Sequence, residues 1–458
     1  EVPRGSYVRM WRNNGRHITR VIILLASWAL LSACEASLGP GFTKPDPRNG
    51  VGGIIVADEP QAVIIAQKIL SNGGSAADAA VALGFGLSVT LQSSAGLGGG
   101  GLCLVYDASR DRADTLDFMP VPAIGRKATA KWHVAIPALT RGLYALHAEH
   151  GKLPWQQVVV PAENLVRSGN IVSRALARDL SRSAIALAND PKALDVFMSS
   201  QRTIAIEGDR IDQLDLAFTL GQIRGKTPSD FYVGGLAQSI DLGAKGAGAS
   251  LSSRDLLAYD PRWDPAESEQ IGSTEYYRAV AFEGYGTTAE RADADLRVGI
   301  ESARDASNNS ATTGFIVADA DRNVVACSLT MLSPFGIGVM PTGLGFLLAP
   351  SPSEIMHLVP PLIVAIAVDH DARDVQYAAA AGGAGVTTQV DASVRRVVFG
   401  QTDLAGSFAS QTEDGEETKV GQINAMYCQR GIGAGLERCA VRPDPKGHGF
   451  GTITVRDR

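Results

Sequence analysis

The sequence contains little that would mark a membrane protein, a disulfide-built scaffold or a nucleic-acid binder. Its five cysteines in 458 residues are too few for a disulfide framework. No window reaches the run of about eighteen apolar residues that indicates a polytopic membrane protein. The net charge of −6 argues against a general nucleic-acid binder. Aromatic residues make up only 6%, whereas 50 glycines predict an architecture of tight turns and close backbone contacts.

Motifs for metal and phosphate binding are also missing. The chain has no CxxC or HExxH pattern, so a zinc site is not expected. The glycine-rich stretch Gly96–Gly101 lacks the Lys-Ser/Thr ending of a phosphate-binding loop. We interpret it as a turn in which the backbone approaches another segment closely. No metal, cofactor or nucleic-acid partner is therefore predicted.

The N-terminal residues have the composition of a targeting segment. Residues 1–33 carry five arginines against one glutamate, and the apolar run 21–33 is too short to span a bilayer but fits a signal peptide. The run ends in Leu31-Ser32-Ala33-Cys34, which resembles a bacterial lipobox. This predicts lipidation of Cys34 and a lipid-anchored protein of the cell envelope that faces the periplasm. The alternative is a buried N-terminal helix with a chance cysteine. Residues 34–50 indicate a linker.

Beyond the linker, the pattern predicts mainly helices in the first half and strands in the second. Residues 54–57 predict a short buried strand, Asp58 is expected to cap the next helix, and Asn72-Gly73-Gly74 ends that helix. A second helix of small residues is expected over 76–89. The further expected elements are strands at 102–106, helices within 137–180, and strands at 315–318, 324–329, 362–368 and around Val397-Val398. This succession indicates a layered α+β or αββα arrangement.

Several segments together resemble the γ-glutamyltranspeptidase family, over roughly residues 50–265 and 312–458. The matching stretches are Asn72–Ala80, Gln92–Gly101, Pro161-Ala162 with Gly169–Leu176, Thr312–Asp319, Gly382-Gly383 and Asp444-Pro445-Lys446. The resemblance implies the four-layer αββα sandwich of the N-terminal nucleophile hydrolases. It also implies a precursor that cuts itself between Ala311 and Thr312. The segments 51–311 and 312–458 would then remain together as a heterodimer that forms one intertwined domain.

The implied reaction is amide hydrolysis or acyl transfer by an N-terminal threonine. A threonine hydroxyl is a weak nucleophile and needs a nearby base. Cleavage would supply one, because a free α-amino group has a pKa near about 7.7–8.0. The acyl group would pass from a small amide or γ-glutamyl substrate to Thr312, and then to water or an amine. By the same resemblance, Gly382 and Gly383 would bind the oxyanion and Thr330 would orient the nucleophile. Taken alone, these residues fit an ordinary strand threonine, a plain turn and a cross-strand hydroxyl.

The sequence departs from the family where the glutamyl group is held. Met119 stands where the family has an arginine for the substrate carboxylate, and Leu332 stands where it has an asparagine. His357-Leu358 replaces a pair of serines, whereas Glu354 keeps the acidic character that holds the substrate amino group. Losing a desolvated partner of a charge costs about 2–5 kcal/mol, so γ-glutamyl substrates should bind roughly 30- to 3,000-fold more weakly. The acyl specificity is therefore expected to be shifted away from γ-glutamyl groups.

Two further features bear on function. The segment 277–311 is shorter than in the family and lacks its proline-serine-glycine stretch. Arg126, Lys127 and Lys131 could replace the lost arginine, but they are more simply interpreted as solvated surface charge. His357 could be a new ligand or base, but a lone histidine is more simply interpreted as structural. A second function thus stays open, namely a degenerate relative that serves as an envelope binding or scaffold lipoprotein. One chain on a denaturing gel would favour it, and two fragments would favour the enzyme.

The cysteines allow separate expectations. Cys428 and Cys439 are predicted to form a disulfide, because an oxidising periplasm permits it and the glycines between them let the chain fold back. Cys103 and Cys327 lie in apolar strand patterns and are expected to be buried free thiols.

Overall fold

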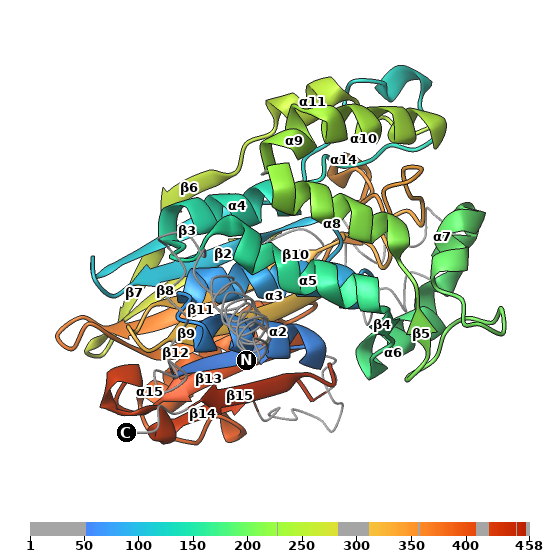
Figure 1. The fold of residues 1–458 in the computed structure, drawn as a ribbon. Helices are drawn as coiled ribbons and strands as arrows, with labels where there is room; N and C mark the ends of the chain where they lie inside the picture. Colours follow the sequence, from blue (N-terminus) through green and yellow to red (C-terminus); the bar gives the residue numbers. More distant parts are fainter. Residues whose placement is uncertain are drawn as a thin grey trace, which may run out of the picture. The chain divides into compact units, whose positions relative to one another are not determined.

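The computed structural model describes residues 52–226, 228–282, 311–355, 358–408, 421–445 and 447–454. The contacts divide the chain between Pro47 and Arg48, and all described residues belong to the second unit. This unit stacks helices, a seven-stranded sheet, a six-stranded sheet and one further helix as four layers (Figure 1). It is the predicted αββα sandwich. Within the described residues, no helix is long and apolar enough to cross a bilayer.

The first sheet contains strands from both predicted segments of the chain. Every neighbouring pair in it is antiparallel. Its strands, in spatial order, are β15 (Phe450–Thr454), β1 (Gly53–Ala57), β9 (Thr312–Asp319), β10 (Val324–Thr330), β2 (Gly100–Asp107), β3 (Arg112–Phe118) and β6 (Arg262–Pro265). The segments before and after Ala311 are thus hydrogen-bonded into one sheet.

The second sheet packs against the first on one face and against a helix on the other. Its strands, in order, are β14 (Cys439–Arg442), β13 (Gln422–Cys428), β12 (Asp374–Gly382), β11 (Leu362–Asp369), β8 (Thr274–Ala281) and β7 (Glu267–Ile271). The covering helix is α15 (Val386–Val398), which buries Val386, Val390, Val394 and Val397. The prediction of a strand around Val397-Val398 is wrong. These residues end a helix whose valines recur at helical spacing, although each valine alone favours a strand.

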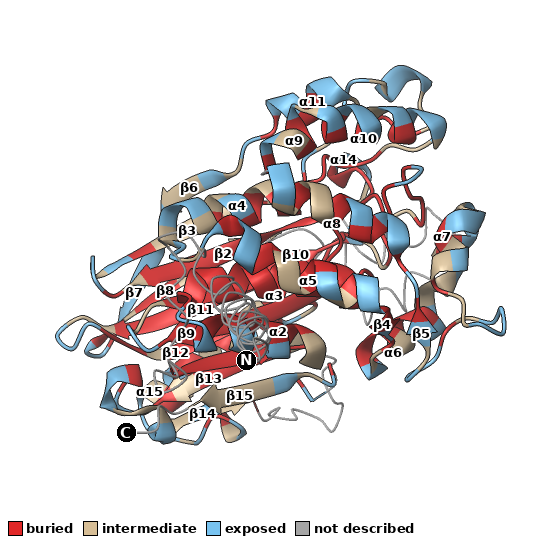
Figure 2. Ribbon diagram, viewed as in Figure 1, coloured by how far each residue is buried: buried red, intermediate tan, exposed pale blue. Residues whose placement is uncertain are grey.

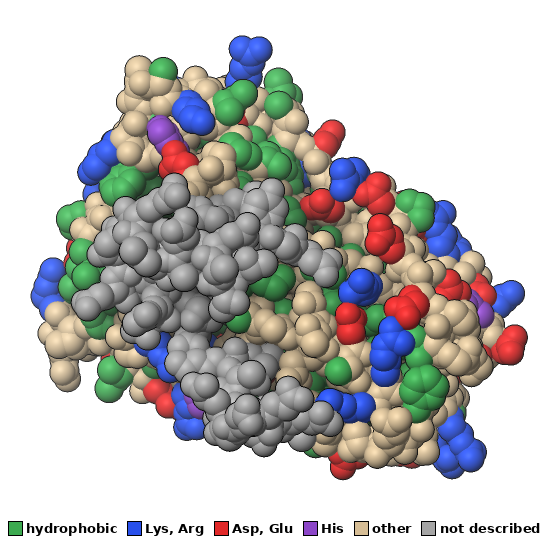
Figure 3. Space-filling model, turned by 180° about the vertical axis from the view of Figure 1, so that it is seen from behind, with side chains coloured by type: hydrophobic (Ala, Val, Ile, Leu, Met, Phe, Trp, Pro, Cys, Tyr) green, Lys and Arg blue, Asp and Glu red, His purple; other side chains and the backbone are tan. Residues whose placement is uncertain are grey.

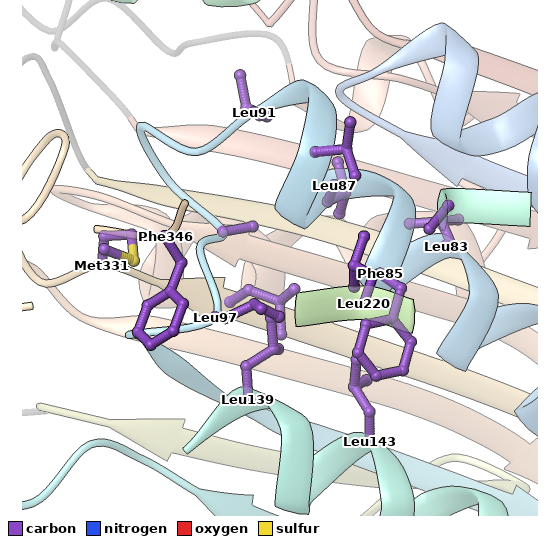
Figure 4. Close-up of a cluster of buried hydrophobic side chains, with 14 of the residues drawn as sticks. Leu83, Phe85, Leu87, Leu91, Leu97, Leu139, Leu143, Leu220, Met331 and Phe346 are labelled. Atoms are coloured by element: carbon purple, nitrogen blue, oxygen red, sulfur yellow. The ribbon is translucent and has the colours of Figure 1, made fainter. Parts of the chain in front are cut away.

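Two helices pack on the face of the first sheet that points away from the second sheet. They are α2 (Pro60–Ser71) and α3 (Ala76–Thr90), and all fifteen residues of α3 are buried (Figure 2). The expected cap at Asp58 is wrong, because Glu59 accepts the hydrogen bond from the Gln61 N–H and caps α2 instead. A Cβ on Gly84 of α3 would lie 2.9 Å from Leu143, so glycine lets the helices approach closely. Figure 4 shows this core, where side chains of α3 meet leucines of neighbouring helices.

The remaining helices surround this core. They are α4 (Leu139–His150), α5 (Trp155–Ser168), α6 (Arg174–Ser183), α7 (Pro191–Val196), α8 (Leu214–Lys226), α9 (Pro228–Tyr232), α10 (Gly235–Gly246), α11 (Ser253–Ala258) and α14 (Pro352–Ile355). A two-stranded ribbon joins β4 (Asn170–Ile171) to β5 (Arg210–Ile211). Short 3₁₀ turns occur at Lys127–Thr129, Ala184–Asn189, Gly406–Phe408, Ile432–Ala434 and Leu436–Arg438. Seen from behind, the described surface mixes acidic and basic side chains (Figure 3).

Four cysteines form two disulfides. Cys428 and Cys439, the predicted pair, are opposite each other in β13 and β14 and are bonded. Cys103 and Cys327 are also bonded, so the prediction of two free thiols is wrong. The register of β2 and β10 places these two residues directly opposite, on the face that packs against the helices. An apolar strand pattern shows that a cysteine is buried but not which strand lies beside it.

The two sheets come unusually close where β9 begins. A Cβ on Gly314 would lie 2.5 Å from the Ala380 carbonyl oxygen of the opposite sheet. Nearby, the Ser328 hydroxyl lies 3.1 Å from the Ala381 carbonyl oxygen and 3.2 Å from that of Ile363. Sheets commonly pack about 10 Å apart. Small residues at this edge therefore bring backbone of one sheet against backbone of the other.

This contact predicts the effect of adding one methyl group. Gly314→Ala should lower the free energy of unfolding by about 1–3 kcal/mol, the usual cost of overpacking a core. Urea-induced unfolding would measure the change. Gly225→Ala in α8 is the matched control, because its added Cβ meets no atom within 4 Å among the described residues. Equal unfolding midpoints for Gly314→Ala and the parent would contradict the close approach.

Candidate active site

Thr312 opens strand β9 at the edge where the sheets converge. It is 2% exposed, and strand alternation places its side chain on the face between the sheets, with Ile316 and Ala318. Among the described residues its hydroxyl oxygen has no hydrogen-bond partner. A buried polar group left unpaired costs about 1–3 kcal/mol, so such a group calls for a specific explanation. A nucleophile that must stay free to attack is one such explanation.

Two glycines of the second sheet border this hydroxyl. Gly382 ends β12, and a Cβ built on it would lie 2.3 Å from Thr312 Oγ1. Only glycine fits there without displacing the threonine. Gly383 follows with a φ of +123°, a conformation that L side chains rarely adopt. Its N–H donates to the Pro361 carbonyl at 3.0 Å.

The peptide before Thr312 is held by two donors. The carbonyl oxygen of Ala311 accepts hydrogen bonds from the Thr330 hydroxyl and from the Met331 N–H, each at 3.0 Å. Thr330 also accepts from the Leu332 N–H at 2.8 Å. Thr330 and Thr312 are opposite each other in β10 and β9. Thr330 therefore contacts the peptide that precedes the predicted nucleophile, and its hydroxyl polarises that carbonyl.

The two apolar residues at the predicted substrate-binding positions, Met119 and Leu332, lie at the same edge. Met119 directly follows β3 and packs against the hydrophobic layer between the sheets. Its backbone N–H donates to Asp117 at 2.9 Å, and its carbonyl accepts from the Tyr259 hydroxyl at 3.3 Å. Leu332 is 5% exposed and has a φ of +62°. This left-handed conformation is unfavourable for leucine and suits asparagine better.

The remaining predicted site residues have partners away from Thr312, are exposed, or lie outside the described residues. Glu354 in α14 is bonded to the Nδ1 atom of His133, and its side chain is 45% exposed. Arg126 forms an ion pair with Asp241, while Lys131 lies over the Trp132 ring. Lys127 and Leu358 are exposed. His357, Cys34 and Lys446 lie outside the described residues, as does most of the shortened segment 277–311.

A buried carboxyl that contacts Thr313, the residue after Thr312, is a candidate site residue that the sequence did not predict. Asp58 is 1% exposed, and its Oδ2 accepts a hydrogen bond from the Thr313 hydroxyl at 2.8 Å. Its Oδ1 accepts from Asn424 of the second sheet at 2.9 Å. Burial, reinforced by the nearby Asp444, raises the pKa of Asp58 to about 6. The available signal was an aspartate directly after a buried strand, which fits a helix cap equally well.

Other observations delimit the site. A cavity of about 450 Å³ lies at the opposite end of β9, where Asp321–Asn323 meet the last turn of α4. Seven residues of strand, at about 3.3 Å each, separate that end from Thr312, so the cavity is distinct from this site. Across the described ranges, no group of three or more His, Cys, Asp or Glu side chains is placed to hold a metal.

The four αββα layers are those of the N-terminal nucleophile hydrolase fold. A cephalosporin acylase from Bacillus halodurans has the same fold, with a TM-score of 0.66 and 15% identity over 90% of this chain and 98% of that one. The family model "Gamma-glutamyltranspeptidase" matches residues 62–291, half of the sequence. The chain belongs to this family. The matched residues include Met119 and end before Thr312.

Named relatives agree with this assignment. The glutathione hydrolase proenzyme of Bacillus subtilis is 31% identical over 248 residues, which cover 49% of this chain and 42% of that protein. Human glutathione hydrolase 7 is 31% identical over 224 residues, which cover 47% of this chain and 34% of that protein. The chain thus spans about a third to two fifths of the length of these relatives.

The buried carboxyls predict how stability depends on pH. Burial raises the pKa of Asp58 from 3.8 to about 6 and that of Glu59 from 4.5 to about 7. At these two carboxyls the folded chain keeps protons that the unfolded chain has already lost, so their contribution to stability falls as pH rises from about 4 to 7. A two-unit shift corresponds to about 3 kcal/mol.

Urea unfolding at several pH values would measure this loss. Asp58→Asn removes one titrating group, so its stability should fall less steeply between pH 4 and 6 than that of the parent. Parallel curves for the two proteins would contradict the raised pKa of Asp58. Glu59 is unchanged in both and serves as the internal reference above pH 6.

Proposed function

We propose that this chain is a self-processing amidohydrolase or acyltransferase of the γ-glutamyltranspeptidase type, with Thr312 as its nucleophile. The observation that carries the proposal is the unpartnered Thr312 hydroxyl beside a carbonyl that two donors hold. Family membership supports an enzyme of this class. The nucleophile, the cleavage and the substrate are our inference from the geometry.

Self-cleavage would begin at the peptide between Ala311 and Thr312. The Thr312 hydroxyl oxygen attacks the Ala311 carbonyl carbon, and the negative charge that develops on the carbonyl oxygen is stabilised by Thr330 and Met331. Such a donor typically contributes about 2.7–4 kcal/mol. Collapse breaks the C–N bond, the nitrogen takes the hydroxyl proton, and an ester remains. Water then hydrolyses the ester, leaving a carboxylate on Ala311 and a free α-amino group on Thr312.

Turnover would reuse the same hydroxyl with the new amino group as its base. An α-amino group with a pKa near about 7.7–8.0 is partly neutral at physiological pH and can accept the hydroxyl proton. We propose that backbone donors of the Gly382-Gly383 turn stabilise the oxyanion. The Gly383 N–H would have to exchange its present bond to Pro361 for the oxyanion. Water or an amine would then release the acyl group.

The acyl group is proposed to be less charged than γ-glutamyl. Met119 and Leu332 offer no charged donor to a carboxylate. Glu354 is bonded to His133, so a substrate ammonium group would have to compete with that imidazole for the carboxylate. These three observations support an amide substrate whose acyl side is more apolar than glutamate.

Self-cleavage should yield fragments that end at Ala311 and begin at Thr312. Edman sequencing of the smaller fragment should read Thr-Thr-Gly-Phe, and the two fragments should copurify as a heterodimer. Thr312→Ala removes the attacking oxygen and should leave one intact chain on a denaturing gel. Cleavage that persists in this variant would rule out the assignment. A parent that stays intact and inactive would favour the envelope scaffold instead.

Restoring an arginine should restore recognition of a carboxylate. Met119→Arg should raise kcat/KM for a γ-glutamyl anilide by roughly 30-fold or more, because a charge-assisted pair contributes about 2–5 kcal/mol. Adding Leu332→Asn should raise it further, since asparagine tolerates the left-handed backbone there. Met119→Leu is the control and should change little. Efficient turnover of this substrate by the parent would show that another cation already holds the carboxylate.

We further propose that the protein is a periplasm-facing lipoprotein, on the basis of the N-terminal sequence. Cys34 would carry the lipid, and residues 1–33 would be the removed signal peptide. Cys34→Ser should move the protein from the membrane fraction to the soluble fraction or block its processing. A variant that fractionates like the parent would argue against lipidation.

A further inference from the structure

Thr313, the residue after the proposed nucleophile, has a hydrogen-bonded hydroxyl, whereas the hydroxyl of Thr312 has no partner among the described residues. Thr313 is 1% exposed, and its hydroxyl donates to Asp58 Oδ2 at 2.8 Å. The Gly314 N–H approaches the same oxygen at 3.4 Å. Asp58 lies just beyond the end of β1, the strand beside β9. One buried carboxyl thus contacts both residues that follow Thr312.

The same carboxyl connects this strand to the opposite sheet. Asn424 of β13 donates from Nδ2 to Asp58 Oδ1 at 2.9 Å and to the Gly314 carbonyl at 2.8 Å. Its Oδ1 accepts from the Asp444 N–H at 2.9 Å. Asn424 lies two residues from Gln422, which pairs with Gly382. The chain of bonds Thr313–Asp58–Asn424 therefore links the strand of Thr312 to the strand that borders Gly382.

This linkage fixes the two elements whose separation matters for chemistry. Side chains that bind and orient reacting groups must be held to fractions of an ångström, and a misplacement of about 1 Å can cost on the order of 100-fold in rate. The Thr312 hydroxyl itself has no hydrogen bond to a described residue, so its position depends on the backbone of β9. Thr313 and Asp58 anchor that backbone one residue away.

We propose that Thr313 is a positioning residue, which acts through Asp58 and Asn424 to hold the Thr312 hydroxyl against Gly382. This inference rests on the proposed function of Thr312. It also assigns a role to Asp444, whose backbone orients the Asn424 amide and which the proposed reaction otherwise leaves unused.

Three single substitutions separate positioning from folding. Thr313→Val keeps the shape and loses the hydroxyl, and it should slow both self-cleavage and kcat by roughly 10- to 100-fold with KM little changed. Thr313→Ser keeps the hydroxyl and should restore most of the rate. Thr219→Val is the control, because that hydroxyl is equally buried and donates to the Leu344 carbonyl at 2.8 Å. It should lower the melting temperature without slowing cleavage of the folded chain.

The measurements are the rate of precursor cleavage on a gel, kcat and KM on an amide substrate, and thermal melting. Wild-type rates in folded Thr313→Val would overturn the inference while leaving the threonine mechanism intact. Equal slowing by Thr313→Ser and Thr313→Val would also overturn it, since the hydroxyl would then be irrelevant. A parent that neither cuts itself nor turns over substrate would remove the proposed function and this inference together.

Discussion

The geometry of the candidate site depends on the close approach of the two sheets at one edge. Gly314 and Ala380 allow it, because any larger side chain at Gly314 would collide with the opposite backbone. The approach places Gly382 directly against Thr312. Elsewhere, larger side chains such as Ile316 and Val364 fill the space between the sheets. The layer is therefore hydrophobic along most of its length and made of backbone and small polar groups only at the candidate site.

At that edge, two neighbouring polar groups differ in how many hydrogen bonds they have. The Ala311 carbonyl has two donors, whereas the Thr312 hydroxyl has no partner among the described residues. A folded protein normally pairs its buried polar atoms. Leaving this hydroxyl unpaired costs stability, and in the proposed cleavage the carbonyl that the two donors polarise is the group that it attacks. The proposed cleavage would break the peptide between Ala311 and Thr312 and leave a free α-amino group beside this hydroxyl.

Local patterns predicted the elements but not their long-range neighbours. The strands at 54–57, 315–318 and 324–329 and the helix at 76–89 each follow from their own residues, and the structure confirms them. The predictions for Cys103 and Asp58 were wrong because the role of each residue depends on a partner far away in the sequence. The partner of Cys103 lies 224 residues away, and that of Asp58 lies 255 residues away. No local pattern encodes which strand lies beside another, so both residues were assigned their commonest local role.

The candidate site could be predicted only from several segments that together resemble the family. Thr312, Thr330 and Gly382 are ordinary residue types in ordinary strands, and their juxtaposition requires the register of two sheets. The sequence could indicate that Met119 and Leu332 are apolar. It could not indicate the left-handed backbone of Leu332 or the pairing of Glu354 with His133, because both depend on how loops between strands are packed.

Buried carboxyls at both ends of β9 explain how this register is kept. At the first end, Asp58 binds Thr313 and Gly314; at the other, Asp319 accepts from the Ala76 N–H at 2.9 Å and from Asn323. Burial raises the pKa of both carboxyls, which shows that each is costly to ionise. A slip of one residue would turn Thr312 away from Gly382 and leave both carboxyls without these donors. We infer that their cost is retained because it penalises every register except the one that forms the site.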